Sequence, residues 1–209
     1  MGRDLDPSCR KCRREGVKLM LKGARCESAK CPMEKQWRQN PPGMHSYPHR
    51  KNSLYGTRLR EKQKVKRYYG LFERQFQQVF AQAQRSSGNT GEALLSLLER
   101  RLDNVVCKAG FASSRKSARI GIVHGHFTLN GRKVDRPGIL VNVGDIVGVK
   151  AKEPSQKWAR ANMESRPAAV QNWLNVDPAK LEATVAALPT REDVQIPVEE
   201  QLIVEFCSR

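Results

Sequence analysis

The sequence predicts an α+β protein that begins with a metal-binding knuckle, because three patterns follow one another along its 209 residues. Four cysteines lie in two close pairs near the N-terminus. The middle of the chain has apolar residues at helical spacing, and after Gly121 apolar residues alternate with polar ones, as in strands. We therefore expect a knuckle, a helical domain and a small module in which two helices pack on a short, mostly antiparallel sheet.

The cysteines Cys9, Cys12, Cys26 and Cys31 form a C-x2-C pair and a C-x4-C pair, separated by thirteen residues. Each pair can supply two thiolates from one tight turn, a spacing that suits tetrahedral capture of a single metal ion. We expect Zn2+, and a [4Fe-4S] iron–sulfur cluster held by the same thiolates is the alternative. The metal would fold a segment that has too few apolar residues to fold alone.

The charge of the chain is strongly positive, at a formal +17, and residues 1–70 hold 19 Lys and Arg against 6 Asp and Glu. A polyanion would relieve this repulsion, which favours a nucleic-acid partner. No apolar run approaches the ~20 residues of a spanning helix, so we expect no membrane partner. Arg3, Asp4 and Asp6 leave no apolar core for a signal peptide, which predicts reduced thiols and a cytoplasmic protein.

The central part of the chain predicts helices. Ser53 is the expected cap of a helix that reaches Gly70 and carries two stripes of basic residues, Arg58, Lys62, Lys66 and Arg60, Lys64, Arg67. A second helix places Phe72, Phe76, Val79, Phe80 and Ala83 on one apolar face. A long amphipathic segment follows from Thr90 to Gly110. Ser113 or Ser114 then caps a helix with Arg115, Lys116 and Arg119 within about one turn.

The later part of the chain predicts strands. Phe127 to Leu129 alternate before Asn130-Gly131, and Asn-Gly between alternating residues is the strongest short hairpin signal. Further strands fit residues 139–141 and 146–149. We expect helices around residues 155–164 and 178–187, and strands at 194–198 and 202–206.

One motif resembles an enzyme signature. Arg101-Leu102-Asp103 is similar to the Arg-Leu-Asp of pseudouridine synthases, in which the Asp is catalytic. The strands are too few and too short to build the large catalytic domain of those enzymes. We therefore expect Glu99 and Asp103 to be satisfied surface carboxylates, with Asp103 paired to a nearby Arg, and we expect no catalytic activity.

Several longer motifs resemble a ribosomal protein family, the fourth protein of the bacterial small subunit (universal family uS-four). The match is carried by residues 98–106, Gly110-Phe111-Ala112 and His124-Gly125-His126 through Asn130-Gly131. Residues 58–64 resemble the helical domain of the family and residues 197–209 its end. The four cysteines resemble its metal-binding branch. The resemblance covers essentially the whole chain.

The resemblance implies a primary binder of 16S rRNA that nucleates assembly of the 5′ domain and body of the small subunit. It also implies a place near the mRNA entry path, an effect on translational accuracy, and contact with neighbouring proteins, notably the fifth. We expect a metal-binding knuckle over residues 1–45, a helical rRNA-binding domain over 46–98, a small RNA-binding module over 99–163, and an acidic segment over 164–209 that packs back on the body. The alternatives are an RNA-modifying enzyme or a zinc-dependent nucleic-acid-binding regulator.

The expected RNA contacts combine electrostatic attraction to phosphates with recognition of RNA shape. The knuckle would order the N-terminal cations before binding, and the helices would supply two further basic surfaces. The residues expected to contact RNA are Arg3, Arg10, Lys11, Arg13, Arg14, Lys18, Lys22, His45, Arg50, Lys51, Arg58, Arg60, Lys62, Lys64, Lys66, Arg67, Arg115, Lys116, Arg119, His124, His126, Asn130, Arg132 and Lys133.

Overall fold

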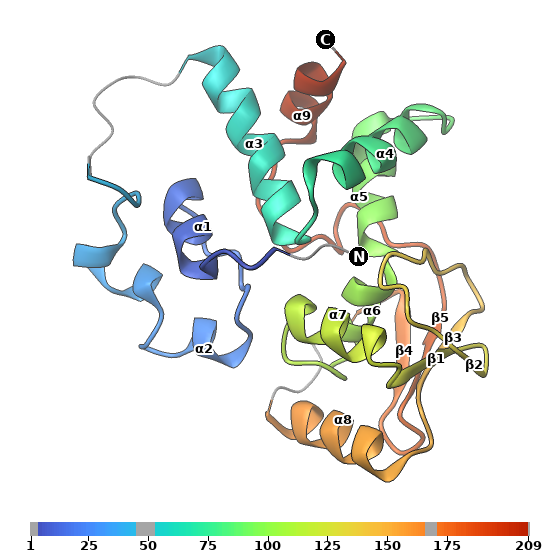
Figure 1. Ribbon diagram of the computed structural model, residues 1–209. Helices are drawn as coiled ribbons and strands as arrows, with labels where there is room; N and C mark the ends of the chain where they lie inside the picture. The colour runs from blue at the N-terminus through green and yellow to red at the C-terminus, as the bar shows by residue number, and fades with distance from the viewer. Residues whose placement is uncertain (1–3, 45–52, 166–170, 209) are drawn as a thin grey trace. The chain divides into compact units, whose positions relative to one another are not determined.

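The computed structural model describes residues 4–44, 53–165 and 171–208 (Figure 1). The chain divides into two compact units. Unit 1 comprises residues 1–94 and 195–209, and unit 2 comprises residues 95–194. Within the described ranges, every helix is too short or too polar to cross a membrane.

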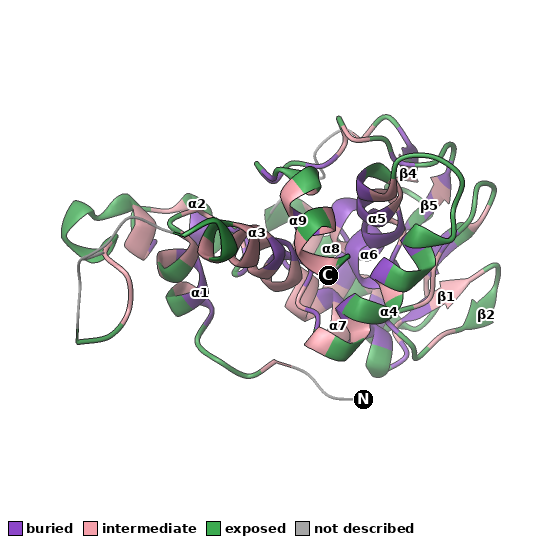
Figure 2. Ribbon diagram, turned by 90° about the horizontal axis from the view of Figure 1, so that it is seen from above, coloured by how far each residue is buried: buried purple, intermediate pink, exposed green. Residues whose placement is uncertain are grey.

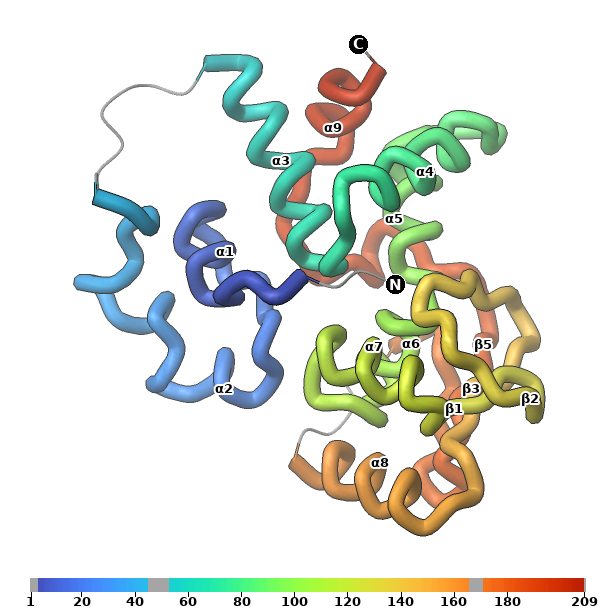
Figure 3. Tube along the Cα trace, in the orientation of Figure 1, coloured from blue at the N-terminus to red at the C-terminus, as the bar shows by residue number. Residues whose placement is uncertain are grey.

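Unit 1 is built from helices. Its elements, in chain order, are α1 (Ser8–Glu15), α2 (Ala24–Glu27), η1 (Pro32–Glu34), η2 (Gln36–Arg38), α3 (Leu54–Tyr68), α4 (Glu73–Gln84), the start of α5 (Thr90–Glu99), and α9 (Glu200–Cys207). Short helices and turns carry the cysteines, and α9 lies alongside α3 although the two are far apart in sequence (Figures 1 and 3).

Helix α3 begins and ends almost where the sequence predicts. The Ser53 hydroxyl accepts a hydrogen bond from the Gly56 amide at 3.1 Å, which confirms Ser53 as the N-cap. Val65 and Tyr68 bury the inner face of the helix, at 0% and 5% exposure. Gly70 follows with a φ of +66°, a left-handed conformation that glycine adopts without steric cost.

The predicted strand over residues 202–206 is wrong, because this segment is helix α9. Ile203 is fully buried, and Tyr55 of α3 packs its ring against Phe206 at a centroid distance of 5.4 Å. Ile203 and Phe206 lie three residues apart and so can face one side of a helix. Residues 194–198 likewise form no strand.

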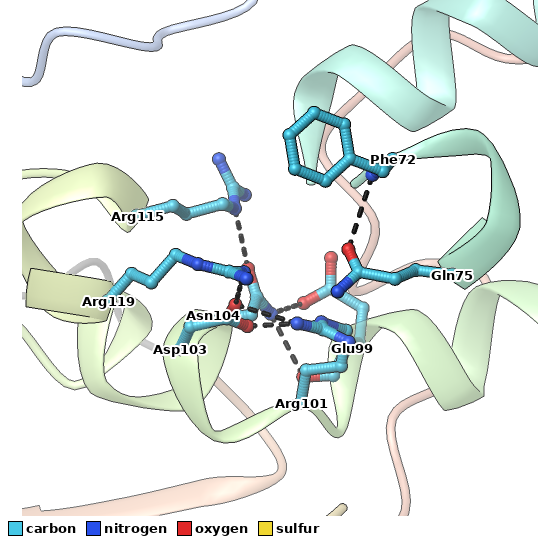
Figure 4. A network of polar contacts seen from close by, with 8 residues as sticks. All are labelled: Phe72, Gln75, Glu99, Arg101, Asp103, Asn104, Arg115 and Arg119. Carbon is cyan, nitrogen blue, oxygen red and sulfur yellow. Dashed lines mark hydrogen bonds and ion pairs between the residues drawn. The ribbon is translucent and has the colours of Figure 1, made fainter. Parts of the chain in front are cut away.

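Helix α4 buries Phe76, Phe80 and Ala83, as its apolar periodicity predicts. Phe72 departs from that expectation: it precedes the helix as its N-cap and is 43% exposed. Its backbone N–H donates to the Gln75 side-chain oxygen at 3.2 Å, so the glutamine satisfies an amide at the start of the helix (Figure 4).

Unit 2 combines helices with one five-stranded sheet. Its elements are the end of α5, α6 (Leu102–Lys108), α7 (Arg115–Val123), β1 (Phe127–Leu129), β2 (Arg132–Lys133), β3 (Ile146–Val149), α8 (Glu153–Ser165), β4 (Leu174–Asp177) and β5 (Glu182–Val185). The strand order is β2-β1-β3-β5-β4, and every pairing is antiparallel. The predicted α+β class is confirmed.

The long amphipathic segment predicted from Thr90 to Gly110 is two helices, α5 and α6. The chain leaves helical geometry at Arg101, which pairs with Leu140 in an isolated β-bridge. Beside the bridge, the Leu102 amide donates to the Ile139 carbonyl at 2.8 Å. This bridge is all that forms of the strand predicted over residues 139–141.

Two helices were predicted in the C-terminal half of unit 2, and the structure confirms one of them. Helix α8 confirms the helix expected around residues 155–164. The helix expected around 178–187 is replaced by β5, in which Ala183 and Val185 are buried on one face. Apolar residues here alternate with period two, as in a half-buried strand. Strands β4 and β5 extend the sheet beyond β3, so the predicted C-terminal segment divides between the two units.

The core of unit 2 lies between the helices and the sheet, and Figure 2 shows buried residues along α6. Its largest members include Trp173, Phe111 and Phe127. Gly121 of α7 allows a close approach at this core. A Cβ atom there would lie 3.0 Å from both Phe127 Cε2 and Trp158 Cη2.

Candidate nucleic-acid interface

The four cysteines of the predicted knuckle line one small pocket, together with Ser8, Leu21 and Met33 among others. Cys12, Cys26 and Cys31 are buried and Cys9 is half-buried. The Lys22 amide donates to the Cys26 sulfur at 3.3 Å. Burial raises the pKa of the Cys12 thiol, and the neighbouring thiolates raise it further against a lowering backbone hydrogen bond from Leu19. Four sulfur atoms lining one pocket are a donor set of the kind that thiophilic ions take.

Cysteines that line the same pocket do not by themselves form a metal centre. In the described part of the chain, no group of three or more His, Cys, Asp or Glu side chains is arranged to hold a metal ion. The structure thus brings the four thiols to one place without setting them in a coordinating arrangement.

The predicted RNA contacts of the knuckle fall into two sets. Lys11 pairs with Asp4, Lys18 lies 2.5 Å from a Glu34 carboxylate oxygen, and Arg13 donates from Nε to the Asn40 carbonyl at 2.8 Å. These three cations are therefore engaged by groups within the segment. In contrast, Arg10, Arg14 and Lys22 are exposed to solvent and can reach a partner. Four further predicted contacts lie outside the described residues: Arg3, His45, Arg50 and Lys51.

The two basic stripes of α3 are ion-paired within unit 1. The pairs are Arg58 with Glu205, Arg60 and Arg67 with Glu15, Lys62 and Lys66 with Glu73, and Lys64 with Glu61. In the sequence, Glu61 is the one acidic residue within this basic stretch. No local pattern could have revealed the other three acids, because they reach α3 from α1, α4 and α9 through the tertiary fold.

Glu15 is the most enclosed of these acids. Its side chain has 0% exposure and faces both Arg60 and Arg67, and one of its oxygens, Oε2, has no hydrogen-bond partner. Burial raises the pKa of Glu15, although the Arg67 and Arg60 charges act in the opposite direction. The carboxylate fixes two guanidinium groups on α3 in defined positions.

In unit 2, Asp103 and Asn104 hold the predicted RNA-binding arginines of α7 (Figure 4). Arg101 donates to both Asp103 oxygens at 3.2 and 2.8 Å, and Arg119 donates to the same carboxylate at 3.3 Å. Asp103 is therefore paired to nearby arginines as expected. It is 3% exposed, however, so the expectation of a surface carboxylate is wrong.

A second chain of hydrogen bonds runs beside the first. The Arg115 Nε donates to Asn104 Oδ1 at 2.7 Å, and the Asn104 amide donates to Glu99 Oε2 at 2.5 Å (Figure 4). Glu99 is fully buried, again unlike the predicted surface carboxylate. The start of α7 is set by Ser114, whose hydroxyl accepts from the Ser117 amide at 3.2 Å, so Ser114 is the cap and not Ser113.

The remaining predicted contacts lie around the hairpin that follows α7. His124, Arg132 and Lys133 are exposed, and Lys116 is half-exposed. His126 instead bonds through Nδ1 to the Ser155 hydroxyl at 2.9 Å and stacks on Trp158. Asn130, at a φ of +49°, bonds to the Asp145 carboxylate and the Ile146 amide. Its side chain supports the turn.

Comparison with known proteins covers both units. The model of the ribosomal protein S4/S9 N-terminal domain matches residues 3–99, and that of the S4 domain matches residues 100–147. The chain is 51% identical over 209 residues to the small ribosomal subunit protein uS4A of Symbiobacterium thermophilum and to that of Alkaliphilus metalliredigens, with full coverage of each. It is 51% identical over 212 residues to uS4 of Pelobacter propionicus, again with full coverage. The chain belongs to the ribosomal protein S4 family.

Proposed function

We propose that this protein is a structural constituent of the small ribosomal subunit that binds 16S rRNA in the cytoplasm. The observation that carries the proposal is the full-length identity of about half of all positions with proteins named as small-subunit uS4. Residues 100–147 supply an S4 domain, and the net charge of +17 suits a polyanionic partner. As a primary binder, the protein would nucleate assembly of the 5′ domain.

Binding rests on two kinds of cation. Exposed residues such as Arg14, Arg132 and Lys133 neutralise phosphates and release counterions. Arginines held by buried acids, such as Arg67 and Arg119, are ordered before RNA arrives. Ordering beforehand lowers the entropy cost of forming the interface.

Two finer roles follow from family membership. The protein would lie near the mRNA entry path and influence translational accuracy, and it would contact neighbouring small-subunit proteins, notably the fifth. The described acids of the C-terminal segment, which include Glu192, Asp193 and Glu199, give that segment a charge suited to a basic protein neighbour.

The metal proposal concerns the cysteine pocket. Four cysteines line it, three of them are buried, and the Lys22 amide bonds to Cys26 sulfur. These features support Zn2+ held by Cys9, Cys12, Cys26 and Cys31, with a [4Fe-4S] cluster as the alternative. Bound zinc would have a structural role, crosslinking α1 to the segment around Cys26 and Cys31.

The test of RNA binding is a filter-binding titration of a folded 16S 5′-domain transcript across a range of salt concentrations. The logarithm of the association constant should fall linearly with the logarithm of the salt concentration. Lys133→Gln should reduce the slope by about one, because one phosphate contact is lost. Lys180→Gln, the same change at a 74%-exposed lysine outside the predicted contacts, is the control and should leave the slope unchanged. Equal or tighter binding to a duplex DNA of the same length would refute the proposal.

A further inference from the structure

Trp37 is a large aromatic residue that the fold leaves in solvent. It lies in η2 and is 68% exposed, whereas Trp173 in unit 2 is 1% exposed. The Arg38 guanidinium lies 4.2 Å from the Trp37 ring centroid, and the Lys35 ammonium lies 6.0 Å from it. The ring is therefore bordered by two cations within cation–π range.

The segment that carries Trp37 is tied down on both sides of the ring. The Gln39 side-chain amide donates to the Met33 carbonyl at 2.8 Å. Arg13 of α1 donates to the Asn40 carbonyl at 2.8 Å and to the Pro41 carbonyl at 3.4 Å. These hydrogen bonds order the turn that carries the ring, so a binding partner loses less conformational entropy in fixing it.

The local charge favours an anionic partner. The nearest acid along the chain, Glu34, is already paired with Lys18 at 2.5 Å. Within the described residues, Lys35 and Arg38 form no ion pair. An exposed indole beside two such cations suits a ligand that offers a flat π face and a negative charge together. A nucleotide combines both, because its base stacks and its phosphate pairs with a cation.

We infer that Trp37 is a stacking site for an unpaired nucleobase of the bound RNA, with Arg38 and Lys35 holding the adjacent phosphates. The inference rests on the proposed function and adds a base contact to an interface otherwise built from cations. The base must be unpaired, at a loop, bulge or junction, because bases inside a duplex are already stacked on their neighbours.

The test measures Trp37 emission while the full protein is titrated with the 16S 5′-domain transcript. Trp37→Phe removes the fluorophore and keeps a ring that stacks, so the difference between wild type and this variant isolates Trp37. We expect RNA to quench that difference signal and to shield it from iodide. A perfectly paired RNA duplex should produce neither effect.

Affinities provide the second readout. Trp37→Ala should weaken binding of the transcript by roughly five- to a hundred-fold, the usual range for loss of one stacked base, while Trp37→Phe should stay within about three-fold of wild type. Leu54→Ala truncates another exposed apolar side chain, 76% exposed, and is the matched control with no expected effect.

The outcomes separate this inference from the proposed function. If the wild-type protein fails to bind the transcript, the proposed function fails. If the transcript binds tightly but Trp37 emission and the affinity of Trp37→Ala stay unchanged, only the stacking site is overturned, and the ring would then be a candidate for docking another protein. Equal losses in Trp37→Ala and Leu54→Ala would also overturn it.

Discussion

Two buried carboxylates, Asp103 of unit 2 and Glu15 of unit 1, each face two arginines of their own unit. Such a carboxylate is costly to bury alone and is stabilised by its partners. Its effect on the arginines is the functional point: a guanidinium held by a fixed acid cannot sample many rotamers. At the scale of residues, the acids prepare the cations that would meet RNA.

Asp103→Asn should destabilise the protein strongly. The change keeps the shape of the side chain but removes the charge that faces Arg101 and Arg119, whose side chains are 7% and 12% exposed. Breaking a buried pair from one side costs about 3–5 kcal/mol. Urea unfolding would measure the loss. Asp135→Asn, the same change at an exposed position, should cost far less; equal stability of the two variants would contradict this account.

At the scale of elements, helices are joined by side chains that come from other parts of the chain. Glu73 at the start of α4 pairs with Lys62 and Lys66 of α3, and Arg58 of α3 pairs with Glu205 of α9 at 2.6 Å. In unit 2, Gly121 lets α7 approach Phe127 and Trp158 closely. Charge pairing and close packing thus decide how elements within each unit fit together.

Glu73→Gln should make the stability of the protein less sensitive to acid. Burial acts to raise the pKa of Glu73, but hydrogen bonds from Lys62 and Lys66 outweigh it, and the pKa is lowered on folding. The stabilisation is then fully present above the pKa of the unfolded chain and is lost as pH falls through the lower folded value. The melting temperatures of wild type and variant should differ at neutral pH, and this difference should disappear at acidic pH. A difference independent of pH would count against the pairing.

Gly121→Ala should destabilise unit 2. The added Cβ would lie 3.0 Å from Phe127 and from Trp158, and overpacking of this kind costs about 1–3 kcal/mol. Over most of that range the cost exceeds the roughly 1 kcal/mol that alanine gains over glycine in a helix. Gly56→Ala in α3 is the control, since its Cβ would meet only Ser53 Oγ at 3.4 Å and the variant should be slightly more stable. Denaturant unfolding would detect both changes; greater stability of Gly121→Ala would show that the rings move aside easily.

At the scale of the whole molecule, charge is distributed unevenly between the ends of the chain. Residues 1–70 carry most of the positive charge, and the segment from residue 164 is acidic. Much of the basic surface on α3 is offset by acids brought from elsewhere, so the exposed cations of the knuckle and of the hairpin after α7 remain for phosphates. Under the proposed function, cations of both units would therefore contribute to RNA binding.

Metal removal tests the cysteine pocket on the intact protein. Purified protein should contain one zinc ion per chain by elemental analysis, and visible absorbance would instead indicate an iron–sulfur cluster. A strong chelator should reduce helical circular dichroism, because the knuckle has few apolar residues to hold it. Cys26→Ser should lower metal content, while Cys107→Ser, outside the pocket, should not. Metal-free protein with an unchanged spectrum would refute a structural ion.

The sequence by itself determined the fold class, the family, and the elements with strong local signals. Ser53 as a cap, the apolar face of α4 and the Asn130-Gly131 turn all depend on neighbours within a few residues. The same locality explains the errors. Residues 202–206 and 178–187 are short apolar runs that fit helix or strand equally, and their packing partners decide between the two.

Only the tertiary structure decided which cations are held and which are exposed. The sequence placed six basic residues on α3 with a single acid, whereas the fold brings Glu15, Glu73 and Glu205 to them from other helices. It also buried Glu99 and Asp103, turned His126 towards Ser155, and left Trp37 exposed. The physical reason is that ion pairing and burial depend on distance in space, and residues many positions apart approach one another only after the chain has folded.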